Sequence, residues 1–179
     1  MELFLINLGW MTFNCLLAIF PVILAQIVFK GKFTFLKFLG VIIWFFFFPN
    51  TIYLVTDIVN IIYDIKYISG IVLLPDFIMY LVLIPIGVIT FVWALSPFEK
   101  MFHKQIPIIV LNFLVGFGIV LGRIQRANSW EVVTNPQSVV AKSLEIIKSL
   151  DLLIMVLVFA VFSQVIYMRF KKSILKVKF

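Results

Sequence analysis

The chain has 179 residues, of which 64% are hydrophobic and 13% are charged, with a formal net charge of +7. The charged fraction is about half of the roughly 25% typical of soluble domains, and so short a chain could not bury this much apolar surface in water. The composition excludes an ordinary soluble domain. It favours an all-α membrane protein, because helices satisfy their backbone hydrogen bonds within each span. No basic segment with interleaved aromatic residues lies outside the apolar runs, so we expect no nucleic-acid partner.

Five apolar segments follow one another along the chain, and each is long enough to cross a hydrocarbon core of about 30 Å. They are Leu3–Phe29, Phe38–Ile62, Ile71–Leu95, Ile106–Gly122 and Leu152–Phe170. No internal repeat or linker divides them. We therefore expect residues 1–179 to form a single integral membrane domain, a polytopic transmembrane helix bundle with about five spans.

The distribution of Lys and Arg predicts the orientation of these spans. The first loop holds three such residues, the third loop two and the tail five, whereas the N-terminus holds none, the second loop one and the fourth loop four. With five spans the first group shares one side of the membrane. Because Lys and Arg collect on the cytoplasmic side, we expect a multi-pass cell-membrane protein whose N-terminus lies outside and whose C-terminus is cytoplasmic.

Pro49 interrupts the second apolar segment. Proline removes a backbone donor and its ring clashes with the preceding turn, so we expect the second span to be broken at Pro49. Two interpretations stay open. The span is either an ordinary kinked helix or a discontinuous helix beside a polar cavity, since irregular backbone at membrane depth must be satisfied by protein or water.

Polar side chains recur after this break, at Asn50, Tyr53, Asp57, Asn60 and Asp64. Their spacings of three and four residues place them on one helical face. This face is expected to turn toward protein or water, because a charge at mid-bilayer costs about 2.5–3.5 kcal/mol. Helix length places Asp57 near the outer membrane boundary, and the alternative is that Asp57 is merely interfacial.

The fourth segment ends in a second group of polar residues. Gly118 and Gly122 form a small-xxx-small pair that permits close helix approach, and Arg123 and Arg126 come next. These arginines arrive at the same leaflet as Asp57, so we predict a carboxylate–guanidinium contact between the second and fourth spans. The alternative is that both arginines are anchors reaching lipid headgroups.

The long fourth loop contains a predicted helix over Pro136–Leu150. Asn135 can cap it, and proline suits the first helical position. Val140, Leu144 and Ile147 share one face of this helix. We expect an amphipathic helix on the outer membrane surface, with a packed lid over the bundle as the alternative.

Two runs of residues give the chain a family resemblance. They are residues 48–57 (FPNTIYLVTD), and Gly122-Arg123 followed by residues 126–131 (RANSWE). Both resemble the bacterial family known as domain of unknown function 1361, and the likeness covers roughly residues 20 to 165. The chain departs from the family pattern at Asn60-Ile61, where a His-Leu pair is common, and at Glu131, where Asp is. If the family's chemistry needs that histidine, this chain lacks it. The resemblance implies a multi-spanning bacterial membrane protein without naming an activity.

The two motifs define a candidate ligand-binding cluster. Its members are Asn50, Tyr53, Asp57, Asp64, Arg123, Arg126, Asn128, Ser129 and Trp130. If one arginine neutralises the carboxylate, the remaining donors favour an anionic group. The expected partners are the lipid bilayer and an anionic lipid, an envelope intermediate or a membrane protein. The single Cys15 and single His103 supply no ligand set, so neither a metal nor a cofactor is expected.

Two other functions stay open beside binding. A broken span with a polar face is also a feature of transporters, although five spans would require a partner or a homo-oligomer. An envelope or lipid enzyme could use Asp57 and Asp64 as paired carboxylates, but no nucleophile with a base is evident, and no catalytic residue is assigned.

Overall fold

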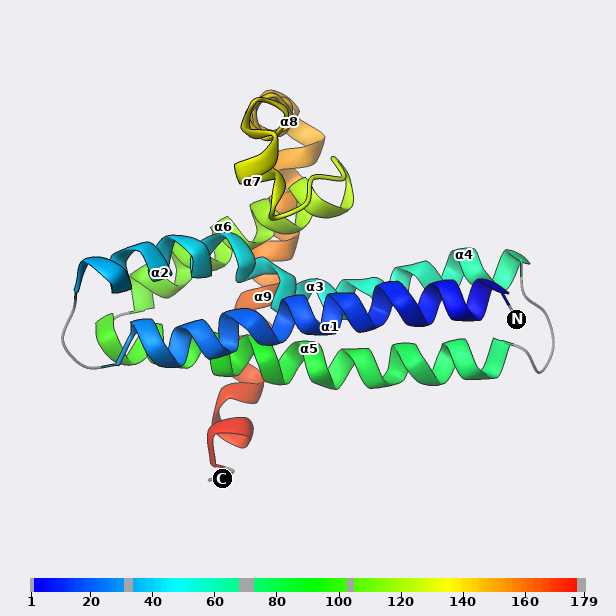
Figure 1. Ribbon diagram of the computed structural model, residues 1–179, viewed down its shortest axis with the longest axis horizontal. Coiled ribbons are helices and arrows are strands. Elements are labelled where there is room, and N and C mark those ends of the chain that lie inside the picture. Colours follow the sequence, from blue (N-terminus) through cyan, green and yellow to red (C-terminus); the bar gives the residue numbers. More distant parts are fainter. Residues whose placement is uncertain (1, 31–33, 68–72, 103–104, 177–179) are drawn as a thin grey trace.

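The computed structural model describes residues 2–30, 34–67, 73–102 and 105–176, which form helices joined by short connections and no strand (Figure 1). In chain order the elements are α1 (Glu2–Val28), α2 (Phe35–Phe47), α3 (Pro49–Thr56), the 3-10 turn η1 (Asp57–Val59), α4 (Asn60–Tyr67), α5 (Leu73–Phe102), α6 (Gln105–Arg123), α7 (Glu131–Thr134), α8 (Pro136–Lys148) and α9 (Leu150–Lys176).

Within this described part, five helical segments are long and apolar enough to cross a membrane. They are Ile6–Val28, Phe35–Ile62, Phe77–Phe102, Gln105–Arg123 and Leu150–Lys176. The chain is therefore a multi-pass membrane protein, and the predicted all-helical bundle with five spans is confirmed.

Two helices continue beyond the apolar segments that predicted them. The third and fifth apolar segments end at Leu95 and Phe170, whereas α5 reaches Phe102 and α9 reaches Lys176. Both helices stay packed there because Glu99 of α5 accepts hydrogen bonds from the Tyr167 hydroxyl at 2.7 Å and from Lys171 Nζ at 2.6 Å, both on α9.

The helices form two groups that cross. Figure 1 shows α1, α3–α4 and α5 side by side along the long axis, while α9 runs across them and α6 packs along α9. A stack of aromatic side chains fills the crossing region. The ring centroid of Phe48 lies 4.6 Å from that of Trp44 and 5.3 Å from that of Phe91, in stacked geometry.

The second span bends at Pro49 without losing helical backbone. Phe48, between α2 and α3, keeps right-handed helical angles, and its N–H donates to Trp44 O at 2.7 Å. The carbonyl of Phe48 accepts from the Thr51 hydroxyl at 2.8 Å. The break predicted at Pro49 is thus a bend, and α6 approaches it closely, because a Cβ at Gly118 would lie 2.6 Å from Pro49 Cγ.

The predicted helix of the fourth loop is confirmed as α8. The Asn135 side chain accepts a hydrogen bond from the Ser138 N–H at 3.3 Å, as expected of a capping residue. Ile146 is fully buried against Val120 and Val156 of the bundle. The outer side of α8 exposes the three apolar residues Val140, Leu144 and Ile147. The helix therefore packs on the bundle by one edge, and its contact with the outer membrane surface stays a prediction.

Candidate functional site

An ion pair between the second and fourth spans forms the centre of the candidate site. Arg123, the last residue of α6, donates from Nη2 to Asp57 Oδ1 at the start of η1. The side chain of Asp57 is 2% exposed and that of Arg123 is 18% exposed. The predicted carboxylate–guanidinium contact is confirmed, and Arg123 is the arginine that makes it.

Three further side chains surround this pair. Asn14 of α1 donates from Nδ2 to the second oxygen of Asp57 at 3.3 Å. Asn60 accepts from Arg123 Nη1 at 3.3 Å, and Arg123 Cζ lies 4.3 Å from the ring centroid of Tyr53, within the range of a cation–π contact. Both carboxylate oxygens of Asp57 are therefore engaged, and the pair is held from α1, α3, α4 and α6.

The backbone explains how these groups meet. The 3-10 turn η1 follows α3 directly and is followed by α4, so this part of the span is not one regular α-helix. The polar stripe nevertheless continues through the turn, from Tyr53 on α3 to Asn60 on α4. Gly122 lets Tyr53 pack beside α6, since a Cβ at Gly122 would lie 3.3 Å from Tyr53 Cε2. Asn14 lies near the middle of α1, so the cluster lies beside the middle of that helix.

Arg126 follows the end of α6 in a backbone conformation that is rare for its residue type. Its φ is 52°, and a left-handed conformation costs a residue with a Cβ about 1–2 kcal/mol. The next N–H, that of Ala127, donates back to Leu121 O at 3.0 Å and closes the helix end. The Arg126 side chain is exposed and forms no ion pair with a side chain that the structure describes; the side chains of Asp64 and Asp76 lie outside that description.

The loop after Arg126 is tied to α8 through Glu131. Glu131 Oε1 accepts from Asn128 Nδ2 at 2.8 Å and from the Asn128 N–H at 3.1 Å. Lys142 Nζ lies 3.5 Å from Glu131 Oε2 and donates to Arg126 O at 3.3 Å. The hydrogen bonds from Asn128, together with the nearby Lys142 ammonium, favour the ionised carboxylate and hold the pKa of Glu131 below its ordinary value.

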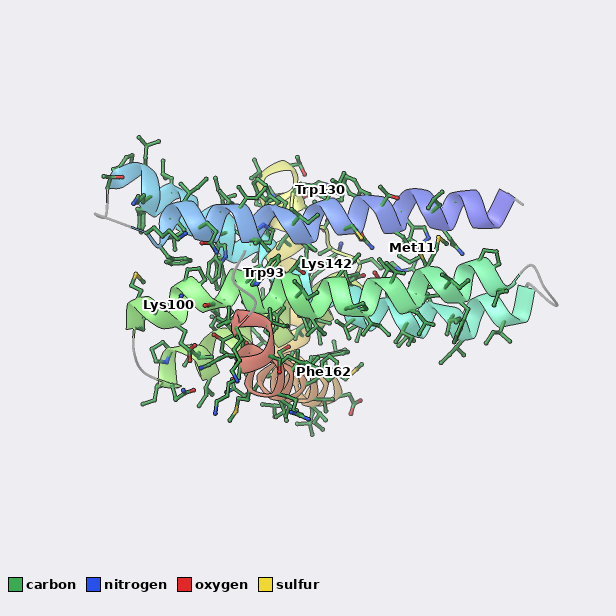
Figure 2. The ribbon with its side chains drawn as sticks, turned by 90° about the horizontal axis from the view of Figure 1, so that it is seen from below. Met11, Trp93, Lys100, Trp130, Lys142 and Phe162 are labelled. Carbon is green, nitrogen blue, oxygen red and sulfur yellow. The ribbon has the colours of Figure 1, made fainter. Side chains whose placement is uncertain are left out.

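Ser129 and Trp130 connect the same loop to the spans. Asn50 Nδ2 donates to Ser129 Oγ at 3.0 Å. The ring of Trp130 packs edge-on against Phe13 of α1, with 5.8 Å between centroids, and Figure 2 shows Trp130 beside α1. The loop thus closes over α1 and α3.

Two cavities adjoin this cluster in the described part. The first, the arginine cavity, has a volume of about 480 Å³, and its walls are Asn7, Trp10, Val59, Asn60, Tyr80, Arg123 and Arg126. The second, the aromatic cavity, has a volume of about 520 Å³ and lies among α1, α2–α3, α6 and the segment from Ala127 to Ser143. Trp10 lines both cavities, so they are neighbours.

Most of the residues proposed from the sequence come together around these cavities. Arg123 and Arg126 line the arginine cavity, while Asn50, Tyr53, Asn128, Ser129 and Trp130 line the aromatic one. Asp57 is the ion-pair partner of Arg123. The side chain of Asp64 lies outside the described residues, so its predicted membership stays a prediction.

The sequence interpretation missed the contribution of α1. Asn14 holds Asp57 from α1, and Asn7 lines the arginine cavity. A signal was present, because two Asn residues seven apart in an apolar helix lie on the same face and need polar partners. In the described ranges, no three His, Cys, Asp or Glu side chains are grouped so that they could hold a metal ion.

Comparison with known proteins identifies a family and no individual relative. A family model described as "Protein of unknown function (DUF1361)" matches residues 13–166. That match covers both sequence motifs and every residue of the candidate cluster. No curated protein and no solved structure matches the chain.

Proposed function

The chain belongs to the DUF1361 family of proteins of unknown function, and from that premise we propose that it binds an anionic group, the phosphate or carboxylate of a lipid or envelope intermediate. The binding site is the arginine cavity, with Arg126 as its principal cation. The observation that carries the proposal is the uneven pairing of its two arginines.

Among the charged side chains that the structure describes near the cavity, one positive charge has no counter-charge. Arg123 is neutralised by Asp57, and Lys142 by Glu131. Arg126 has no such partner among the side chains that the structure describes, and it lines the same cavity as Arg123. A guanidinium presents several donors in a fixed plane and suits a phosphate or carboxylate particularly well.

Two further features support an anion here. Arg126 is held at φ 52°, a position where glycine or asparagine would be less strained, and such outliers concentrate at functional sites. In addition, Arg123 keeps a buried Nε donor for which the described residues supply no acceptor. An unsatisfied buried donor costs about 1–3 kcal/mol, and an anion's oxygen or a bound water would relieve it.

The test compares Arg126→Gln with Arg169→Gln, a matched control on an exposed arginine of α9. The probes are short-chain phosphatidic acid and the corresponding phosphatidylcholine, titrated onto the purified protein. Loss of one charge-assisted contact, worth about 1.5–3 kcal/mol, should weaken phosphatidic acid binding by roughly 10- to 100-fold in Arg126→Gln alone. Unchanged binding, or unfolding of Arg126→Gln in detergent, contradicts the proposal.

A transporter component is the second candidate, because the second span departs from a straight α-helix twice, at the bend at Pro49 and at the 3-10 turn η1. Transport predicts flux of the anion into sealed vesicles that contain the purified protein, whereas binding alone predicts none.

A further inference from the structure

We infer that the aromatic cavity holds one hydrocarbon chain of the lipid, which enters sideways from the bilayer. This inference rests on the proposed anionic ligand for the identity of the headgroup, and on separate observations for the chain. It assigns the ligand to the class of anionic lipids and adds a second subsite.

The walls of the aromatic cavity suit hydrocarbon. They are mostly apolar, and they include Leu17 of α1, Phe45 and Phe48 of the second span, and Val115 and Phe117 of α6. Apolar cavities of about 150 Å³ already bind benzene-sized molecules, and this one measures about 520 Å³. It therefore has room for a stretch of alkyl chain.

The rim of the cavity shows where a chain would enter. Phe13, Phe46, Leu114 and Trp130 line the cavity, yet each is exposed at the surface of the protein. The first three lie on membrane-spanning helices, whose exposed apolar faces are solvated by lipid chains. The cavity consequently opens toward the hydrocarbon of the bilayer between α1, α2 and α6.

Hydrocarbon is also the occupant that the energetics favour. An empty space leaves its wall atoms without dispersion contacts on one side. Water needs two to four polar partners to stay in a cavity, and most of the lining residues are apolar, while Asn50 and Ser129 of the wall already bond each other. A lipid chain restores the missing contacts along the apolar remainder.

Asn14 and Trp10 connect the aromatic cavity to the arginine cavity. Asn14 lines the aromatic cavity and donates to Asp57, whose partner Arg123 lines the arginine cavity. Trp10 forms part of both walls. A headgroup beside Arg126 and a chain beside Leu17 would thus belong to one molecule that crosses this junction.

The loop and α8 cover the cavity on its remaining side. Val139 and Ser143 of α8 line it, and Lys142 between them fastens α8 to Glu131 and to the Arg126 carbonyl. The backbone carbonyl of Arg126, the residue proposed to bind the headgroup, therefore accepts a hydrogen bond from the lysine that holds α8 over the cavity.

The experiment places the purified protein in phosphatidylcholine vesicles that contain phosphatidic acid with a diazirine at the end of one acyl chain. After illumination, mass spectrometry maps the crosslinked residues. We expect crosslinks at cavity-wall residues such as Phe117. Leu17→Trp, which fills the cavity, should reduce them several-fold, while Leu16→Trp, on the exposed neighbouring position of α1, should leave them unchanged.

The outcomes separate this inference from the proposed function. Crosslinks confined to outward residues such as Leu16, even if phosphatidic acid retention still depends on Arg126, overturn the chain site and leave the anion site standing. Equal cavity crosslinking by the diazirine on phosphatidylcholine supports the chain site and contradicts the anion site. If Leu17→Trp does not fold, the map of the unaltered protein decides alone.

Discussion

Replacing Asp57 by Asn tests the buried ion pair at the centre of the cluster. The change keeps the size of the side chain but leaves the Arg123 guanidinium without its counter-charge. Removing one partner of a buried pair costs about 3–5 kcal/mol. Because Arg123 is 18% exposed, water screens part of the stranded charge, and we expect a loss near 3 kcal/mol.

The loss should be visible as a lower unfolding temperature in detergent, followed by intrinsic fluorescence. For a chain of this size about 1 kcal/mol corresponds to about 2–4 °C, so Asp57→Asn should unfold roughly 6–12 °C lower. Arg123→Gln should cost a similar amount, since it strands the carboxylate, which is 2% exposed. The double variant should then lose less than the sum, by about 1–3 kcal/mol.

A second ion pair provides the control for this measurement. Lys171 and Glu99 pair at 2.6 Å, with the Lys171 side chain 31% exposed, so water competes more strongly and Lys171→Gln should cost only about 1 kcal/mol. Additive losses in the Asp57 and Arg123 double variant would refute the argument that the two charges compensate each other inside the bundle.

Three other predictions address helix packing, pH and orientation. Gly116→Ala should destabilise the protein by about 1–3 kcal/mol, because the added Cβ would lie 2.4 Å from Val156 O. Gly9→Ala is the control and should leave the stability unchanged, because nothing lies within 4 Å of the added Cβ. Equal thermal stability of the two variants would contradict this packing. The ionised form of Glu131 holds the loop, and its pKa is lowered on folding, so the contribution of Glu131 is present above the ordinary pKa of 4.5 and is lost as the pH falls through the lowered value. Trp130 fluorescence should report that loss, and a Glu131→Gln variant with the same acid transition would contradict it. The orientation is tested in a variant without Cys15 that carries one new cysteine, at Ser138 or at Lys176. In intact cells an impermeant thiol reagent should label the cysteine at Ser138 and leave the one at Lys176 unlabelled. The reverse pattern would overturn the predicted orientation.

The five spans and the central ion pair could be predicted because both depend on patterns that are strong in a membrane. Long apolar runs have few alternatives to spanning helices, and a carboxylate such as Asp57 within such a run demands a partner. The cap at Asn135 was equally predictable, since its side chain and Pro136 suit the first turn of a helix.

Other features depend on tertiary contacts, which the local sequence pattern does not determine. The choice of Arg123 over Arg126 follows from where α6 ends, and the left-handed φ of Arg126 has no sequence signal at a non-glycine residue. The extension of α5 beyond Pro97 depends on the bonds that Glu99 makes to α9. The cavities arise from the crossing of helices, which local periodicity does not determine.

The separation of Asp57 and Arg123 along the chain has a consequence for biogenesis. The two residues are 66 positions apart, and at a synthesis rate of about 5–20 residues per second the acid leaves the ribosome about 3–13 seconds before its basic partner. Asn14, which donates to Asp57 in the folded chain, is already synthesised on α1 during that interval. A hydrogen bond from Asn14 would then supply the Asp57 carboxylate with a polar partner until the fourth span is inserted with Arg123.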